Sequence, residues 1–201
     1  MKKKSSPESG RPRSFNINVA LDTALRLFRE KGYEGTSLSD LTKAMGINRP
    51  SLYAAFGDKR ALFENALQRY SDFYHVYLRE ALQQETGRAV AEHLLLNSAR
   101  LLADPQNPRG CLFVQGALAC GEGAESVRQE LINHRGKVEK EIRRRLKRAK
   151  ADGDLPPTAS PADLAAFLAS VMYGMSVRAA SGKSRAELKR VAETALQAWP
   201  K

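Results

Sequence analysis

Apolar residues recur at intervals of three and four from about residue 16 almost to the C-terminus, a spacing that places them on one face of an α-helix. Residues 16–31 show the pattern clearly through Ala20, Ala24 and Phe28, and a glycine follows their basic end as a stop signal. No stretch alternates apolar and polar residues as a half-buried strand would. The sequence therefore predicts an all-α fold of about nine helices.

Two short helices are predicted between residues 36 and 57. The first has Ser37 and Asp40 as an approximate capping box and ends at a glycine. The second has Asn48 as its N-cap and Pro50 in its first turn, and it also ends at a glycine. Because only a short glycine-containing turn separates them, the pair is typical of a helix-turn-helix, whose second helix enters the major groove of DNA.

The residues of this pair and its flanks resemble a known family. Residues 32–62, GYEGTSLSDLTKAMGINRPSLYAAFGDKRAL, closely resemble the DNA-binding segment of the tetracycline-repressor (TetR) family. The resemblance covers roughly residues 15–65, and beyond it only the helical plan and the total length agree. It implies a homodimeric transcription regulator, usually a repressor, that binds an inverted-repeat operator in double-stranded DNA and responds to a small-molecule inducer.

The resemblance also implies a set of DNA contacts. Arg49, at the start of the second short helix, would make a bidentate contact to a guanine edge. Tyr53 and Lys59 match family residues that contact phosphate, and the N-terminus of the first short helix would meet another phosphate. Ala54 and Ala55 stand where the family often has a large polar residue, so fewer direct contacts to bases are expected than is usual in the family. The predicted DNA-binding residues are Thr36, Ser37, Asn48, Arg49, Pro50, Ser51, Tyr53 and Lys59.

We expect three parts along the chain. Residues 1–14 form a disordered basic arm, residues 15–60 a helix-turn-helix DNA-binding domain, and residues 61–201 a helical ligand-binding and dimerisation domain. In the arm, Arg11 and Arg13 could enter a narrow minor groove, and a tail that adds only nonspecific attraction is an equally good interpretation. The helices expected beyond residue 57 span residues 58–86, with Gly87 as their stop, then 89–103, 110–120, 125–152, 162–181 and 185–198.

The resemblance places the dimer surface on the last two helices and a ligand pocket among the middle ones. A ligand there would shift the fourth helix, so that the two reader helices no longer match a groove spacing of about 34 Å. The Met-rich apolar stripe of the last two helices is also typical of the core of a single protomer. The dimer residues predicted are Phe167, Val171, Met175, Leu188, Val191, Ala195 and Trp199, and the pocket residues are Leu101, Phe113, Gln115, Met172 and Tyr173.

Two cysteines are present, Cys111 and Cys120. On one helix, residues nine apart face opposite sides with a rise of about 13 Å, which rules out a disulfide within that helix. Residues 109–114, RGCLFV, resemble a Gly-Cys-Leu segment of one TetR subgroup with members that respond to electrophiles. Arg109 and the helix N-terminus would favour a thiolate at Cys111. The alternative is a small buried thiol.

Charge leaves two further interpretations open. The net charge of +11 favours nucleic acid or an anionic surface as a partner. Residues 137–150 carry eight Lys or Arg against two Glu, which suits a solvated helix face, an anionic ligand, a partner or extra DNA contact. An alternative to the sequence-specific regulator is a basic helical module that binds nucleic acid or an anionic surface without sequence preference. A second alternative is a small-molecule enzyme built on a helical bundle.

Several classes of site are not predicted. His75, His93 and His134 lack metal-ligand spacing, and we find neither a phosphate-binding loop nor a nucleophile motif, so we expect no metal, no cofactor and no catalytic residue. The start of the chain lacks a hydrophobic region, and the most apolar window, residues 164–175, is shorter than the roughly 20 residues that cross a bilayer. We therefore expect a cytoplasmic protein with no membrane partner.

Overall fold

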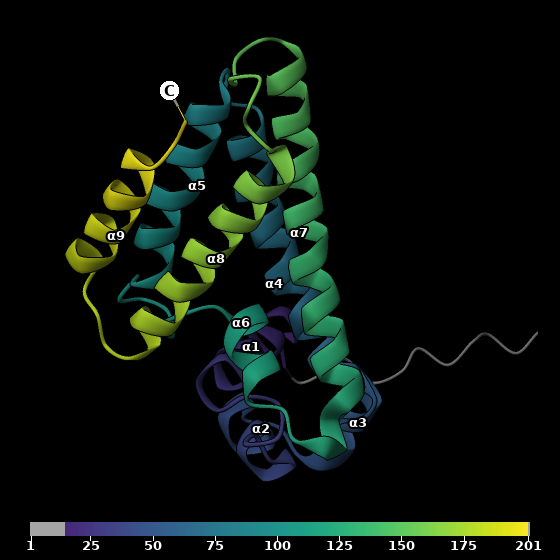
Figure 1. The fold of residues 1–201 in the computed structure, drawn as a ribbon. Helices are drawn as coiled ribbons and strands as arrows, with labels where there is room; N and C mark the ends of the chain where they lie inside the picture. The colour runs from purple at the N-terminus through teal and green to yellow at the C-terminus, as the bar shows by residue number, and fades with distance from the viewer. Residues whose placement is uncertain (1–14, 201) are drawn as a thin grey trace, which may run out of the picture.

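The structure is a computed structural model that describes residues 15–200, and the regular structure in that range is entirely helical (Figure 1). The predicted all-α fold is confirmed for these residues. The basic arm with Arg11 and Arg13 lies outside them. The elements are α1 (Ile17–Lys31), α2 (Leu38–Met45), α3 (Arg49–Phe56), α4 (Lys59–Leu82), α5 (Gly87–Leu102), α6 (Leu112–Leu118), the 3-10 turn η1 (Glu122–Ala124), α7 (Glu125–Ala151), α8 (Pro161–Ala180) and α9 (Arg185–Gln197).

The helices form a small module at one end of an elongated body. Figure 1 shows α1, α2 and α3 gathered at this end, while α4 and α7 run from it toward the other end of the molecule. Helix α5 packs against α8 and α9, and α7 packs against α6 and α8. Helix α1 joins the two parts through its contacts with α2 and α4. One hydrophobic core runs through both parts, so a change in the body can reach the module through packed side chains.

The caps predicted for the two short helices are present. Ser37 and Asp40 form a complete capping box at the start of α2, and the Asn48 side chain accepts a hydrogen bond from the backbone N–H of Ser51 at 2.9 Å. Gly46 takes φ 65°, the left-handed conformation that lets the chain turn from α2 into α3. Leu41 and Leu52 are fully buried, which fixes the angle between the two helices.

The boundary between α4 and α5 differs from the expectation. Helix α4 ends at Leu82, and Gly87 begins α5 instead of ending α4. The reason is a tertiary contact: the buried Arg145 side chain donates hydrogen bonds to the carbonyls of Leu82, Gln84 and Glu85, which satisfies the end of α4 early. One member of the basic run 137–150 is therefore a structural residue.

Candidate DNA-binding and ligand-binding sites

Helix α3 presents one face to the core and the other to solvent. Leu52 and Phe56 are buried beneath it, whereas Arg49 and Pro50 are exposed and Tyr53 is 49% exposed. An aromatic ring so exposed on a two-turn helix contributes little to the core. The exposed face of α3 therefore carries the side chains predicted to contact bases and phosphate.

The remaining predicted DNA residues differ in how free they are. Thr36 is fully buried, and its hydroxyl donates to the Gly32 carbonyl at 2.7 Å, so this side chain holds the turn between α1 and α2. Ser37 is exposed at the N-terminus of α2. Lys59 begins α4 with its Nζ 4.4 Å from the centre of the Tyr33 ring, and burial lowers the pKa of this amine. The Thr36 hydroxyl is therefore not free for a phosphate, and the Ser37 hydroxyl is engaged with Asp40 in the capping box, so the predicted phosphate contact at this turn is left to backbone N–H groups of the α2 N-terminus.

Polar contacts fasten the α1–α3 module to the loops on both sides of α6. Arg29 on α1 donates to the carbonyls of Pro108 and Gly110 at 2.6 and 3.3 Å and stacks over the Tyr70 ring at 5.1 Å. Beyond α6, the backbone N–H of Gly121 donates to the Glu34 carboxylate. Helix α6 is thus held at both ends by the α1–α3 module.

Replacing Arg29 by alanine is expected to lower the free energy of unfolding by about 2 kcal/mol, because hydrogen bonds from a charged donor are lost and two carbonyls lose a partner. Urea unfolding followed by circular dichroism measures the change. Arg26→Ala is the matched control, since Arg26 is exposed and makes a single bond of 3.2 Å to the Gln106 carbonyl. Equal losses in the two variants would contradict the role given to Arg29.

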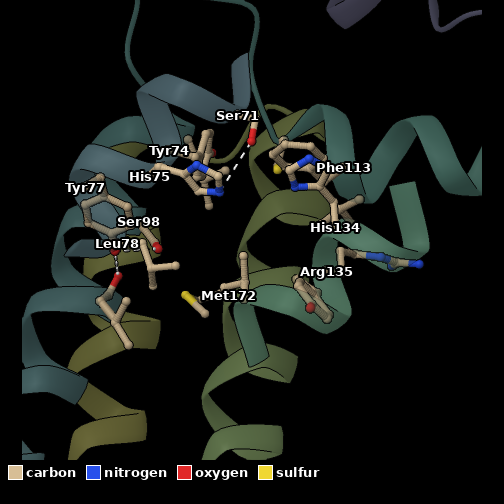
Figure 2. A pocket seen from close by; sticks show the side chains of 16 residues that line it. Ser71, Tyr74, His75, Tyr77, Leu78, Ser98, Phe113, His134, Arg135 and Met172 are labelled. Atoms are coloured by element: carbon tan, nitrogen blue, oxygen red, sulfur yellow. Dashed lines mark hydrogen bonds between the residues drawn. The ribbon is translucent and has the colours of Figure 1, made fainter. Parts of the chain in front are cut away.

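A cavity lies inside the body among α4, α5, α7 and α8, beside the start of α6 (Figure 2). Its volume is about 70 Å³, and its wall is almost wholly apolar. His134 stacks on Phe113 with ring centres 4.5 Å apart, and burial, followed by the charge of Lys137, lowers the pKa of this imidazole. The lining residues are Ser71, Tyr74, His75, Tyr77, Leu78, Leu94, Ser98, Leu102, Cys111, Phe113, Val114, His134, Arg135, Val138, Met172 and Tyr173.

The pocket prediction is only partly matched by this cavity. Phe113, Met172 and Tyr173 line it, as does Cys111. Leu101 and Gln115 lie elsewhere: Leu101 borders a separate cleft between α1 and α4, and the Gln115 side chain donates to the Ser176 carbonyl. The two histidines of the wall, together with Tyr74 and Tyr77, were missed because their helical spacing matches that of ordinary core.

Cys111 faces the cavity, but its surroundings differ from those expected. It precedes α6, is buried, and its backbone N–H donates to the Ser176 hydroxyl at 2.9 Å. The Arg109 guanidinium instead donates to the Gly182 carbonyl at 2.8 Å, which commits it to the loop between α8 and α9. The expected support of a Cys111 thiolate by Arg109 stays a prediction. The two cysteines flank α6 instead of sharing it, and both are free.

The residues predicted for the dimer surface fall into two groups. Phe167, Val171, Val191 and Ala195 are half-buried and line a shallow groove on the outer face of α8 and α9. Three others, Met175, Leu188 and Trp199, are buried within one protomer and belong to its core. Their assignment to the interface is corrected accordingly.

Two further observations concern ions and membranes. Within residues 15–200, no group of three or more His, Cys, Asp or Glu side chains is arranged to hold a metal ion. None of the helices described for this part of the chain is long and apolar enough to cross a membrane.

These features define a helix-turn-helix protein in which the α1–α3 module, called the reader below, is attached to a larger helical body with an internal cavity. The family described as bacterial regulatory proteins, tetR family, matches residues 20–66, and the family described as tetracyclin repressor-like, C-terminal domain, matches residues 88–195. The chain belongs to the TetR family of bacterial transcriptional regulators.

Characterised relatives span nearly the whole chain. It is 32% identical to the HTH-type transcriptional repressor ComR of Escherichia coli (strain K12) over 95% of this chain and 92% of ComR. The repressor BdcR of the same organism is 30% identical over 98% and 95% of the two chains. Among solved structures, a cysteine mutant of the TetR-family regulator CifR in complex with 26-bp double-strand operator DNA is 41% identical, with a TM-score of 0.91 over 95% of this chain and 100% of CifR.

Proposed function

We propose that this protein is a cytoplasmic, homodimeric repressor that binds an inverted-repeat operator and leaves it when a small molecule or electrophile occupies the body. The observation that carries the proposal is α3 itself: Arg49 and Tyr53 are exposed on a helix whose opposite side is buried in the module core. ComR and BdcR are named as repressors, and CifR was solved on operator DNA, which supports the same role here. A non-covalent ligand would be bound and released unchanged, an electrophile would form an adduct with Cys111, and we propose no catalytic role.

Selection of the purified protein on a random DNA pool at fixed, near-physiological salt tests the proposal. An inverted repeat should be enriched, since one short helix reads too few base pairs and two-fold dimers read two half-sites. Binding without enrichment would contradict the proposal and favour a basic module that attracts nucleic acid nonspecifically.

The path from cavity to reader follows α4 and the segment before α6. Phe113 and Cys111 form part of the cavity wall, and Gly110, directly before Cys111, accepts a hydrogen bond from Arg29 of the reader module. A ligand that enlarges the cavity would move this segment or α4, which continues from the reader into the cavity wall. The ligand must bind the conformation that leaves DNA more tightly than the conformation that binds DNA. Equal affinity for the two conformations would not shift the equilibrium between them.

Alkylation of Cys111 by N-ethylmaleimide is expected to release operator DNA, because an adduct on a thiol facing the cavity fills it. Mass spectrometry and fluorescence anisotropy on the same samples follow modification and release. Cys120→Ser should respond like the unmodified sequence, since burial raises the pKa of the Cys120 thiol and disfavours its thiolate. A Cys111→Ser protein that still releases DNA on treatment would refute the proposal that an electrophile acts through Cys111.

A further inference from the structure

A basic groove lies between the C-terminal halves of α4 and α7. Arg79 from α4 and Lys137, Arg144 and Arg148 from α7 line it, and Glu141 is the one carboxylate in its wall. Glu141 pairs with Arg144. Among the residues described, no ion pair involves the other three cations, so the groove carries a clear excess of positive charge.

This groove adjoins the internal cavity. His75, Leu78 and Val138 line both, so the groove and the cavity meet at these side chains. The two surfaces are chemically opposite, with an apolar and aromatic wall inside and cationic side chains outside. Figure 2 shows His75 and Leu78 at the cavity, with Phe113 and His134 across from them.

The groove is poorly placed for DNA. Figure 1 shows the C-terminal parts of α4 and α7 at the end of the body away from α2 and α3, which carry the reader. Lys137, Arg144 and Arg148 are exposed on α7 well beyond its start near the reader. These exposed cations are hydrated, and their position beside the cavity makes them available to an anionic ligand instead of the operator.

We propose that the regulatory ligand is an amphipathic organic anion, with its apolar body in the cavity and its carboxylate or phosphate head between Arg79 and Lys137, the groove cations next in sequence to the shared residues Leu78 and Val138. This inference rests on the proposed function and names the ligand class of its sensor site. An anionic head would lose its hydration inside the apolar cavity without a charged partner, whereas the Arg79 guanidinium and the Lys137 ammonium beside the cavity offer donors to its oxygens. A ligand of this shape satisfies both surfaces at once.

Calorimetric titration with decanoate, decyl phosphate and 1-decanol, each below its aggregation concentration, separates the contribution of the charged head group to affinity from that of the alkyl chain. Both anions are expected to bind at least tenfold more tightly than decanol, with the advantage shrinking as salt rises. A preference between the two anions tells a carboxylate ligand from a phosphate ligand. Equal affinity for decanol and the anions would overturn the proposal.

Charge-neutralising variants then locate the head. The double variant Arg79→Gln/Lys137→Gln should lower anion affinity about tenfold and leave decanol affinity unchanged. The matched control is Lys140→Gln/Lys147→Gln, which removes two exposed charges of α7 that do not line the groove. Equal losses in the two double variants would show a diffuse field and refute the assigned groove.

Operator binding, measured on the same samples, keeps this inference separate from the proposed function. Selective anion binding without operator release would retain the ligand class and contradict the proposed regulation. Intact operator binding with no selective anion binding would retain the repressor and overturn the ligand class.

Discussion

Replacing Arg49 by alanine is expected to weaken binding to the selected operator by roughly 30- to 25,000-fold at fixed salt, since each protomer loses one bidentate contact of about 1–3 kcal/mol. Arg49 is exposed at the first turn of α3, and its removal leaves the Asn48 cap and the buried Leu52 in place. Fluorescence anisotropy with the operator and with scrambled DNA of equal length measures the change. Affinity for the scrambled DNA should fall far less.

Tyr53→Phe is the comparison that distinguishes a base contact of Arg49 from a phosphate contact. A phosphate contact carries no sequence information, so loss of the Tyr53 hydroxyl should weaken operator and scrambled DNA by similar factors. Circular dichroism should show both variants folded, because both side chains are exposed. Should Arg49→Ala also weaken both DNAs equally, Arg49 would be a phosphate contact and the specificity would lie elsewhere on α3.

The reader was predictable because its signals are local. The capping box of Ser37 and Asp40, the Asn48 cap and the left-handed Gly46 each act within a few residues, and all are present. Such short-range hydrogen bonds and backbone preferences depend little on the rest of the chain. The helix boundaries of this part could therefore be read from the sequence almost to the residue.

The body was less predictable because distant contacts decide it. Arg145 lies some 60 residues from the α4 end that it closes. Periodicity shows that Met175 and Leu188 face inward, but it cannot distinguish the core of one protomer from an interface between two. Likewise, the histidines of the cavity come from α4 and α7, and only the packing of those helices brings His75 and His134 within 6.2 Å of each other.

Replacing Val171 by aspartate is expected to convert the dimer to a monomer and to weaken operator binding at least a hundredfold. Val171 lies in the α8–α9 groove with Phe167, Val191 and Ala195, the predicted dimer residues that are only half-buried in the protomer. In a two-fold interface each substitution appears twice, so two carboxylates would enter one apolar contact without a partner. Light scattering after size exclusion measures the mass, and anisotropy measures DNA binding.

Leu118→Asp is the control for this variant, because Leu118 is 70% exposed on α6, outside the groove. It should remain dimeric, which would show that an added surface charge alone does not separate the protomers. A dimeric Val171→Asp protein would move the interface away from this groove. A monomer that keeps full operator affinity would instead contradict the requirement for two linked readers, since a monomer reads one half-site and lacks the second set of contacts that the dimer supplies without a further association step.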